Sequence, residues 1–172
     1  AGDQSGASVS LSADGSVVAI GAFGNDGNGN YSGHVRIYKN DNGTWTQIGS
    51  DIDGEAAYDN SGNSVSLSAD GSVVAIGARS NDGNGTNSGH ARIYQNVGGS
   101  WKKIGDDIDG EAAGDQSGYS VSLSDNGSVV AIGARSNDGN GRNSGHARIY
   151  QTTSLFTAVN IAENKTAVAS YT

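Results

Sequence analysis

The feature of this sequence that most restricts its fold is an internal repeat with a period of 56 residues. The segment Ser-Val-Ser-Leu-Ser begins at Ser8 and returns at Ser64 and Ser120, and the segment Val-Val-Ala-Ile-Gly-Ala of residues 17–22 returns unchanged in both later copies. A unit of this length cannot bury an apolar sheet on both sides by itself. Neighbouring copies must therefore stack on one another.

Each copy is predicted to contain four short strands. Residues 9–11 alternate apolar side chains with Ser, the period of a half-buried strand. Residues 17–22 are almost all apolar, which predicts a strand covered on both faces. Residues 35–38 and 45–48 complete the unit, and Asn42-Gly43 between them is typical of a hairpin turn. No stretch has helical periodicity, so no helix is predicted.

The expected fold class is all-β, with tandem four-stranded antiparallel blades of the β-propeller type. Three blades do not close a ring, since propellers usually have about four to eight. The natural chain is then longer, or several chains assemble, or the units stack as an open solenoid. The repeats are expected over residues 1–153, as about 2–57, 58–113 and 114–153, followed by a strand-like tail at 154–172.

Composition supports a turn-rich β protein and excludes several classes. The 172 residues include 28 Gly but no Pro, Cys or Met, so chain reversals depend on Gly, Asn and Asp, which tolerate positive φ. The net charge of −8 comes without a basic stripe, which argues against nucleic acid as a partner. No apolar run approaches the roughly 18 residues of a membrane span. A start at Ala1 without a signal peptide is typical of a processed product or a piece of a longer protein.

The repeated segments resemble a known family. Residues 2–151 resemble the FG-GAP repeats of integrin α-chain propellers through Ser-Gly-x-Ser-Val-Ser-Leu-Ser, Asp-Gly, Val-Ala-Ile-Gly-Ala and Gly-His-(Val/Ala)-Arg-Ile-Tyr. They are most similar to near-identical arrays in large secreted or surface proteins of microbes. The resemblance implies a propeller blade in an extracellular setting of adhesion or recognition. Integrin-type repeats commonly carry a calcium loop between the first two strands, whereas residues 13–16 here are too short to wrap a cation.

The tail resembles a second family over a short stretch. Residues 156–164 and 166–172 are similar to the opening strands of bacterial cadherin-like domains, whose Glu-Asn motif places a Glu near interdomain calcium. By its own pattern the tail predicts two strands around an Asn164-Lys165 turn. These strands would replace the missing fourth strand of the third copy or pair with the sheet edge of another chain.

A loop rich in Asn and Asp recurs in every copy and is a candidate cation site. Asp and Asn lie two residues apart with Gly between them, as in loops that direct oxygen ligands at a hard cation such as Ca²⁺. The alternative is a long turn in which these side chains bond to their own backbone. The candidate metal ligands are Asp26, Asn28, Asp82, Asn84, Asp138 and Asn140.

Two further polar patterns follow the repeat. Asp51, Asp53 and Glu55, and their counterparts at 107–111, place carboxylates at alternate positions. A cation or backbone N–H groups would neutralise them on a strand, or they form a solvated turn between units. One His also recurs per copy, and histidines of separate units are predicted to lie apart, with structural roles rather than a shared metal site. These are His34, His90 and His146.

Catalysis is not expected, because it requires one asymmetric set of groups and the copies offer three similar surfaces. Trp45 and Trp101 are expected to pack rather than to stack on sugars. Five Asn-x-Ser/Thr sequons would carry glycans only after a eukaryotic secretory route. A recognition surface would lie where the copies differ. There are three sets of equivalent positions: Ala7/Asn63/Tyr119, Phe23/Arg79/Arg135 and Asn30/Thr86/Arg142.

Together these patterns predict a non-enzymatic, extracellular or cell-surface β-repeat module for adhesion or recognition. Its partner would be a protein or glycan surface ligand, or copies of the chain itself in a homo-oligomer or polymer. One alternative is a structural subunit of an extracellular filament or sheath assembled by β-strand addition. Another is a glycan-binding lectin. Apart from Ca²⁺ in the Asn- and Asp-rich loops, no cofactor is expected.

Overall fold

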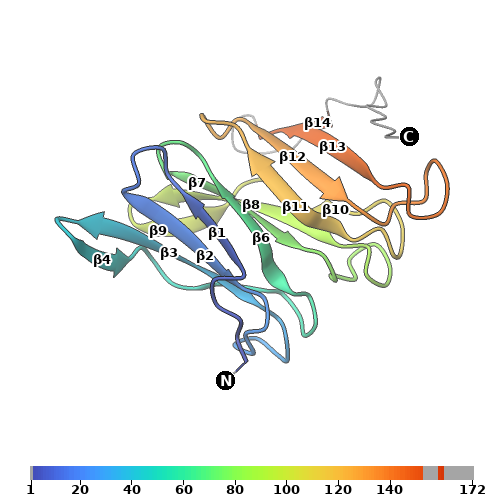
Figure 1. Ribbon diagram of the computed structural model, residues 1–172, viewed down its shortest axis with the longest axis horizontal. Helices are drawn as coiled ribbons and strands as arrows, with labels where there is room; N and C mark the ends of the chain where they lie inside the picture. The colour runs from blue at the N-terminus through green and yellow to red at the C-terminus, as the bar shows by residue number, and fades with distance from the viewer. Residues whose placement is uncertain (1, 153–158, 161–172) are drawn as a thin grey trace.

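A computed structural model describes residues 2–152 and 159–160 and folds them into three antiparallel sheets placed side by side (Figure 1). The first blade contains β1 (Ser8–Leu11), β2 (Val17–Ala22), β3 (His34–Asp41), β4 (Thr44–Gln47) and β5 (Ile52–Asp53). The middle blade contains β6 (Ser61–Leu67), β7 (Val73–Ala78), β8 (His90–Val97), β9 (Ser100–Lys103) and β10 (Ile108–Asp109). The third blade contains β11 (Ser117–Leu123), β12 (Val129–Ala134), β13 (His146–Gln151) and β14 (Val159–Asn160).

The all-β class and the blade-like arrangement of antiparallel sheets are confirmed, and the three sheets do not close into a ring. Within residues 2–152 and 159–160 there is no helix. The same described residues therefore offer no helix that could cross a lipid bilayer.

Local sequence explains how each blade is built. In the first blade β1 pairs with β2, β2 with β3 and β3 with β4. The turn between β3 and β4 is the predicted hairpin, with Asn42 at φ 52° and Gly43 at φ 92°. The short strand β5 was not predicted: it pairs with the start of β3, through His34 with Asp53 and Val35 with Ile52. The outer strand of the blade is thus made of two pieces.

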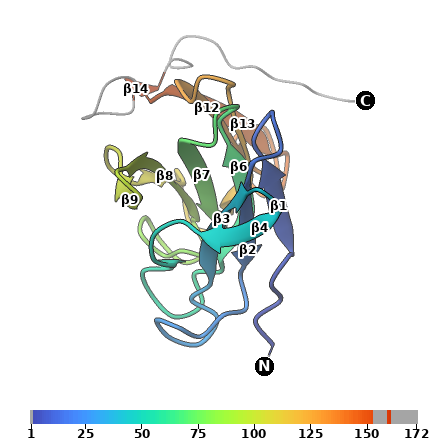
Figure 2. The same cartoon turned by 90° about the vertical axis from the view of Figure 1, so that its left-hand side faces the viewer.

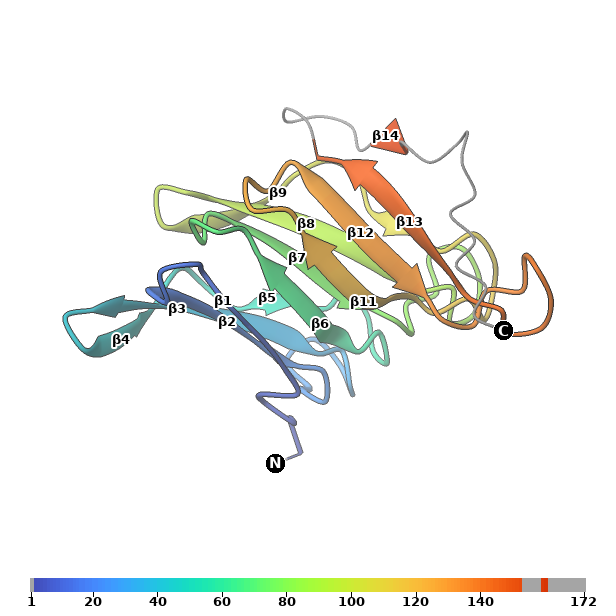
Figure 3. The same cartoon turned by 45° about the horizontal axis from the view of Figure 1, so that its top comes forward.

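The blades fan out from their first strands. The inner strands β1, β6 and β11 lie next to one another, whereas β4 and β9 lie apart (Figures 2 and 3). Side chains join the inner strands: the Leu67 N–H donates to Ser10 Oγ at 3.0 Å, and the Leu123 N–H donates to Ser66 Oγ at 2.9 Å. The same bond, one repeat apart, shows that the two junctions have the same geometry.

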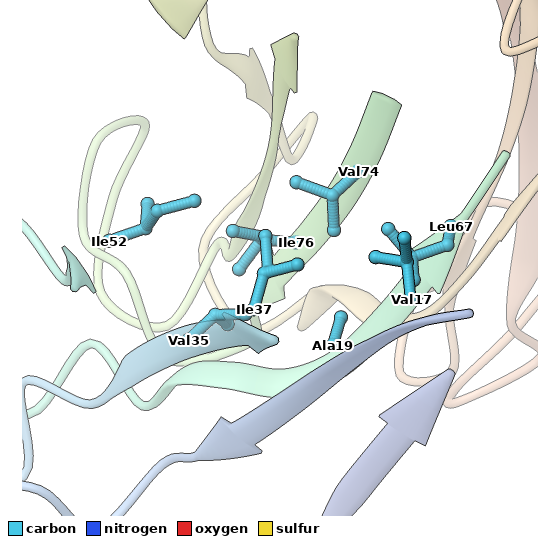
Figure 4. Packing of buried hydrophobic residues seen from close by; sticks show 8 residues of the cluster. All are labelled: Val17, Ala19, Val35, Ile37, Ile52, Leu67, Val74 and Ile76. Atoms are coloured by element: carbon cyan, nitrogen blue, oxygen red, sulfur yellow. The ribbon is translucent and has the colours of Figure 1, made fainter. Parts of the chain in front are cut away.

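An apolar core fills the junction between the first and middle blades (Figure 4). Side chains from β2, β3 and β5 face side chains from β6 and β7. The buried members are Val17, Ala19, Val35, Ile37, Ile52, Leu67, Val74 and Ile76. Burial of a Val or Ile side chain contributes about 1.5–3 kcal/mol, so stacking of the blades stabilises the fold.

A second core of the same kind fills the junction between the middle and third blades. Its buried members are Val73, Ala75, Ala91, Ile93, Ile108, Val130, Ile132 and Tyr150. Alternate residues of β7 therefore serve two different cores, and all six residues of this strand are buried. In β2 and β12 only one set of alternate residues meets a neighbouring blade, and Val18, Ile20, Val129 and Ala131 are half-buried. The prediction of two covered faces is correct for the middle copy and wrong for the outer two.

Glycine permits the close approach of the blades. A Cβ added at Gly21 would lie 2.1 Å from the carbonyl oxygen of Gly62, and a Cβ added at Gly77 would lie 2.0 Å from that of Gly118. A serine hydroxyl of the same blade donates to each of these carbonyls, at 2.8 Å and 2.9 Å. The glycine of the repeated Val-Val-Ala-Ile-Gly-Ala segment is thus needed wherever another blade follows.

The expected tail falls almost wholly outside the described residues. The two residues of β14 pair with β13, Val159 with Gln151 and Asn160 with Tyr150. This is the place that β4 and β9 occupy on the other blades. The likeness to a cadherin-like domain rests on residues outside the described part and stays a prediction.

Candidate functional site

Several of the positions that differ between the copies come together at one end of the first two strands of the blades. Phe23, Arg79 and Arg135 follow β2, β7 and β12, and Tyr119 lies near the start of β11. The guanidinium carbon of Arg79 lies 5.7 Å from the ring centroid of Phe23 and 5.8 Å from that of Tyr119. That of Arg135 lies 4.1 Å from the Tyr119 ring centroid. These four residues form a continuous arginine–aromatic row across all three blades.

Hydrogen bonds hold the row in place. Arg135 Nε donates to Gln116 Oε1 at 2.9 Å, and Asn63 Nδ2 donates to the carbonyl oxygen of Tyr119 at 3.0 Å. Cation–π contact between a guanidinium and an aromatic face is worth about 0.5–1 kcal/mol at an exposed site. Phe23, Arg79 and Tyr119 are half-buried and Arg135 is exposed, so a ligand in solution can reach them.

The Asn- and Asp-rich loops bond extensively to backbone. Asp26 Oδ1 accepts from the Tyr31 N–H at 2.8 Å, and Asn28 Nδ2 donates to the carbonyl oxygens of Gly54 and Glu55 at 2.8 and 3.1 Å. Asp82 and Asn84 make the same bonds in the second copy. In the third copy Asp138 accepts from the Asn143 N–H, and the Asn140 N–H donates to Ser144 Oγ. This bonding agrees with the turn interpretation. Ca²⁺ binding at these six residues stays a prediction.

Each copy instead places its histidine beside carboxylates, a grouping that sequence reasoning missed. His90 is 1% exposed, and its Nδ1 lies 3.9 Å from Glu55 Oε2, 4.0 Å from Asp107 Oδ2 and 3.9 Å from Asp109 Oδ1. In the first blade His34 Nδ1 lies 3.6 Å from Asp51 Oδ2. Among the residues that the structure describes, two groups could hold a metal ion, because their ligand atoms lie within 4.8 Å of one another: His34, Asp51 and Asp53, and Glu55, His90 and Asp107.

Electrostatics at the His90 junction work in two directions. Burial, assisted by the charge of Arg92, lowers the pKa of His90 to about 4, so the imidazole is neutral near pH 7, as a metal ligand must be. Two cations compete with a metal for the carboxylates: Lys103 Nζ lies 2.7 Å from Asp107 Oδ1, and Arg92 Nη1 lies 3.3 Å from Glu55 Oε1. Burial raises the pKa of Glu55. Burial alone would also raise the pKa of Asp107, but the Lys103 hydrogen bond and the neighbouring His90 lower it.

Sequence did contain a signal for this grouping. The spacing from His to the following pair of aspartates is the same in the first two copies. The three histidines belong to separate blades, as predicted. The prediction considered only contacts between histidines, whereas β5 and β10 bring acids to His34 and His90.

A pocket of about 410 Å³ lies between the first and middle blades. Trp101 forms part of its wall, and the indole Nε1 donates to the carbonyl oxygen of Ile48 at 3.0 Å, which fixes the ring. Asp51 also lines the pocket; its two carboxylate oxygens share the Arg36 Nε–H and one accepts from Arg36 Nη2, and these hydrogen bonds lower the pKa of the carboxyl group. The lining residues are Gly49, Ser50, Asp51, Ile52, Asp53, Tyr94, Ser100, Trp101 and Lys102. Aromatic rings beside acidic and hydroxyl groups are a composition that suits a polar ring-shaped ligand.

Three tandem antiparallel blades, with unequal side chains brought together at one end of their first two strands, define a propeller-type repeat protein. The chain belongs to the FG-GAP repeat family, which matches residues 51–94 and 108–150. The predicted resemblance is therefore confirmed. No curated protein matches the chain.

Solved structures with a similar fold come from proteins of different kinds. A putative 6-phosphogluconolactonase from Bacteroides uniformis is 15% identical with a TM-score of 0.59, over 89% of this chain and 39% of its own. Sqt1 of Saccharomyces cerevisiae is 12% identical with a TM-score of 0.57, and the match covers 92% of this chain and 35% of Sqt1. The periplasmic gluconolactonase PpgL of Pseudomonas aeruginosa is 16% identical with a TM-score of 0.53, and the match covers 84% of this chain and 38% of PpgL. The chain thus spans less than two fifths of these proteins, and the likeness shows the fold alone.

The prediction that the chain is not an enzyme is contradicted by two of these names, since both are lactonases. The physical error lies in the assumption that three copies give three similar surfaces. Arg79 stands between Phe23 of the preceding blade and Tyr119 of the next, so the copies converge on one asymmetric cluster. Repetition of the sequence therefore does not exclude an asymmetric site.

Proposed function

We propose that this chain is an extracellular or cell-surface recognition module that binds a partner through the arginine–aromatic row. The proposal is supported by membership of the FG-GAP repeat family and by the placement of the row at the ends of strands, where binding residues usually lie. It concerns the segment of 172 residues, which is shorter than the proteins of similar fold.

The single observation that carries the proposal is the meeting of variable positions. The copies repeat one another closely, yet Phe23 of the first copy stands where Arg79 and Arg135 stand in the others, and Tyr119 stands where the second copy has Asn63. All five of these residues come from the set in which the copies differ. These five positions belong to three different blades, yet they contact one another in one contiguous surface.

The chemistry of the row favours an acidic partner. Two guanidinium groups lie close together in a chain of net charge −8, and Arg presents several N–H donors in a planar fork that fits carboxylate or sulfate. Aromatic rings beside them add apolar contact area. A carboxylated or sulfated surface glycan has both an acidic group and apolar ring faces.

The test is binding of the purified chain to immobilised alginate, heparin and a neutral glucan. We expect binding to the two acidic polysaccharides, with loss of at least about tenfold in affinity when Arg79 and Arg135 are both changed to Ser. Arg142→Ser is the matched control, because it removes an exposed arginine at another variable position. Equal retention of the double variant and the unmodified chain would refute the assignment of the row, and absence of binding to all three would refute the acidic partner.

A second candidate function is a lectin that uses the 410 Å³ pocket. Sugars stack on aromatic rings and hydrogen-bond to carboxylates, and the pocket offers Trp101, Tyr94 and Asp53. Titration with a panel of neutral monosaccharides should quench tryptophan fluorescence if this candidate is right. Trp45→Phe should leave the quenching intact and Trp101→Phe should remove it, and quenching that survives in Trp101→Phe would exclude the pocket.

Calcium is the proposed cation of the Asn- and Asp-rich loops. Removal of Ca²⁺ with a chelator should then lower the melting temperature of the chain, and the combined variant Asp26→Asn, Asp82→Asn, Asp138→Asn, which changes all three loops, should abolish that difference. An identical melting temperature with and without chelator would remove calcium from the proposal and leave the recognition surface unaffected.

A further inference from the structure

We propose that the outer faces of the first and third blades dock on each other between two copies of the chain, head to tail, and complete a ring of six blades. The N-terminal face is defined here as Val9, Leu11, Val18 and Ile20 of the first blade. The C-terminal face is defined as Val129, Ala131, Gly133 and Ile149 of the third blade. The first and third blades stand at the two ends of the stack, with the middle blade between them (Figure 3). The residues of both faces alternate along their strands with residues that pack on the middle blade, so the two faces point away from it.

Exposure of equivalent residues shows that no further blade of the described part of the chain covers these faces. Leu11 is 60% exposed, whereas Leu67 at the same place in the middle blade is 7% exposed. Ile149 is 39% exposed, whereas Ile93 is 3% exposed. Val9 is 64% exposed, whereas its equivalent Val65 packs against the first core. The same side chains are thus core residues at one position of the stack and surface residues at its ends.

The two faces are complementary because the chain already contains their contact twice. At both internal junctions, the equivalents of the C-terminal face in one blade pack on the equivalents of the N-terminal face in the next. The N-terminal face of a second copy therefore offers the third blade the surface that the middle blade offers the first. No new complementarity has to be assumed.

Hydrogen-bonding groups follow the same logic. Ser8 Oγ donates to the Gly62 carbonyl oxygen, and Ser64 Oγ donates to the Gly118 carbonyl oxygen. In the ring, Ser120 Oγ would donate to the Gly6 carbonyl oxygen of the second copy. The Leu67 and Leu123 N–H groups donate to serines of the preceding blade. By the same rule, Leu11 N–H of the second copy would donate to Ser122 Oγ. The docked interface reproduces polar as well as apolar contacts.

The hydrogen bonds and exposure of the repeated arginine also depend on whether a blade precedes it. Arg92 and Arg148 donate to the carbonyl oxygens of Asp53 and Asp109 in the blade before them. Arg36 in the first blade bonds to Asp51 of its own blade, and its side chain is 43% exposed against 5% for Arg92. Arg36 thus has the exposure expected of a junction residue without its junction.

Blade number selects the size of the assembly. A head-to-tail contact uses two different surfaces, so it must close into a ring or grow into an open filament. Propellers close with about four to eight blades, so two copies of three blades fall in that range and three copies do not. The edges of the blades have a smaller role, since the faces offer both apolar area and hydrogen-bonding partners.

Analytical ultracentrifugation of the chain across micromolar concentrations tests the proposal. We expect a reversible equilibrium between the 17.3 kDa monomer and a species of twice that mass. Leu11→Lys and Ile149→Lys should each weaken association by about 100-fold or more, because a lysine must then be buried at both interfaces of the ring. Val97→Lys is the matched control: Val97 is 56% exposed but lies at the tip of the β8–β9 hairpin, so this variant should dimerise normally.

Mixing distinguishes head-to-tail docking from any other dimer. Leu11→Lys keeps an intact C-terminal face and Ile149→Lys keeps an intact N-terminal face, so an equimolar mixture should recover a dimer that neither forms alone. A monomer at all concentrations would overturn the proposal. So would dimerisation of either lysine variant by itself, or a series of ever larger oligomers. Circular dichroism of each variant confirms that loss of dimer is not loss of fold.

Discussion

The middle blade and the two outer blades have nearly the same sequence but differ in what they bury. Every residue of β7 is buried, whereas β2 and β12 each leave one set of alternate residues half-exposed. Position in the stack, and not sequence, makes this difference. Residues that the sequence marks as core become core only where another blade supplies the second surface.

The largest expected effect concerns the same isoleucine in two blades. Ile93→Ala should lower the free energy of unfolding by about 3–4 kcal/mol, because the side chain is 3% exposed and a cavity would remain. Ile149→Ala should cost less than about 1 kcal/mol, since its side chain is 39% exposed. Urea denaturation of the dilute monomer measures both. Equal costs would show that the third blade is covered as well as the middle one.

Acid should act chiefly through the buried histidine of the middle blade. The unfolded chain takes up a proton at His90 near pH 6.5, whereas the folded chain does so only near pH 4. Stability is therefore lost as the pH falls from 6.5 to 4, by roughly 3 kcal/mol for a shift of this size, and is fully present above that window.

His90→Gln should flatten the pH dependence of urea stability between pH 6.5 and 4. The matched variant His34→Gln should flatten it less, because His34 belongs to the first blade, whose outer face is open, although burial also lowers the pKa of His34. If both variants keep the full loss of stability in acid, the attribution to His90 is wrong.

Glycine at a junction should be less replaceable than the same glycine at the end of the stack. In Gly77→Ala the new Cβ would lie 2.0 Å from the Gly118 carbonyl oxygen, and we expect a loss of about 2–3 kcal/mol. In Gly133→Ala the neighbours within reach, among described residues, are atoms of Ser120, whose side chain can rotate away. Thermal denaturation should therefore show almost no change for Gly133→Ala in the monomer, while the same variant should fail to dimerise. An equal loss at both glycines would contradict this account.

Serine hydroxyls give the smallest expected difference. Ser66 Oγ accepts from the Leu123 N–H across a junction, so Ser66→Ala should cost about 1 kcal/mol. Ser122 occupies the equivalent place on the C-terminal face, and Ser122→Ala should leave the stability of the monomer unchanged. Denaturation above the dimerisation concentration sharpens the test, because a cost for Ser122→Ala would then appear.

Local features of the fold could be predicted because their causes are local. The alternation at residues 9–11, the apolar run at 17–22 and the positive-φ turn at Asn42-Gly43 each depend on neighbours in sequence. The short strand β5 escaped prediction because two residues carry no periodicity, and pairing with β3 alone defines it.

The candidate site could be predicted only in part. Comparison of the copies marked Phe23, Arg79, Tyr119 and Arg135 as variable, but not as neighbours, since Arg79 and Phe23 lie one full repeat apart in sequence. Their contact depends on the rotation between blades, which no local pattern encodes. The same limit hid the approach of Glu55 to His90 across a junction.

By itself the sequence determined the period, the strands, the turns and the requirement that copies stack. These follow from short-range sterics and from the alternation of apolar and polar side chains along a strand. Only the tertiary structure decided which copies are covered on both sides and which side chains of different copies meet. The reason is that burial and contact are properties of pairs of surfaces, and each copy carries just one member of each pair.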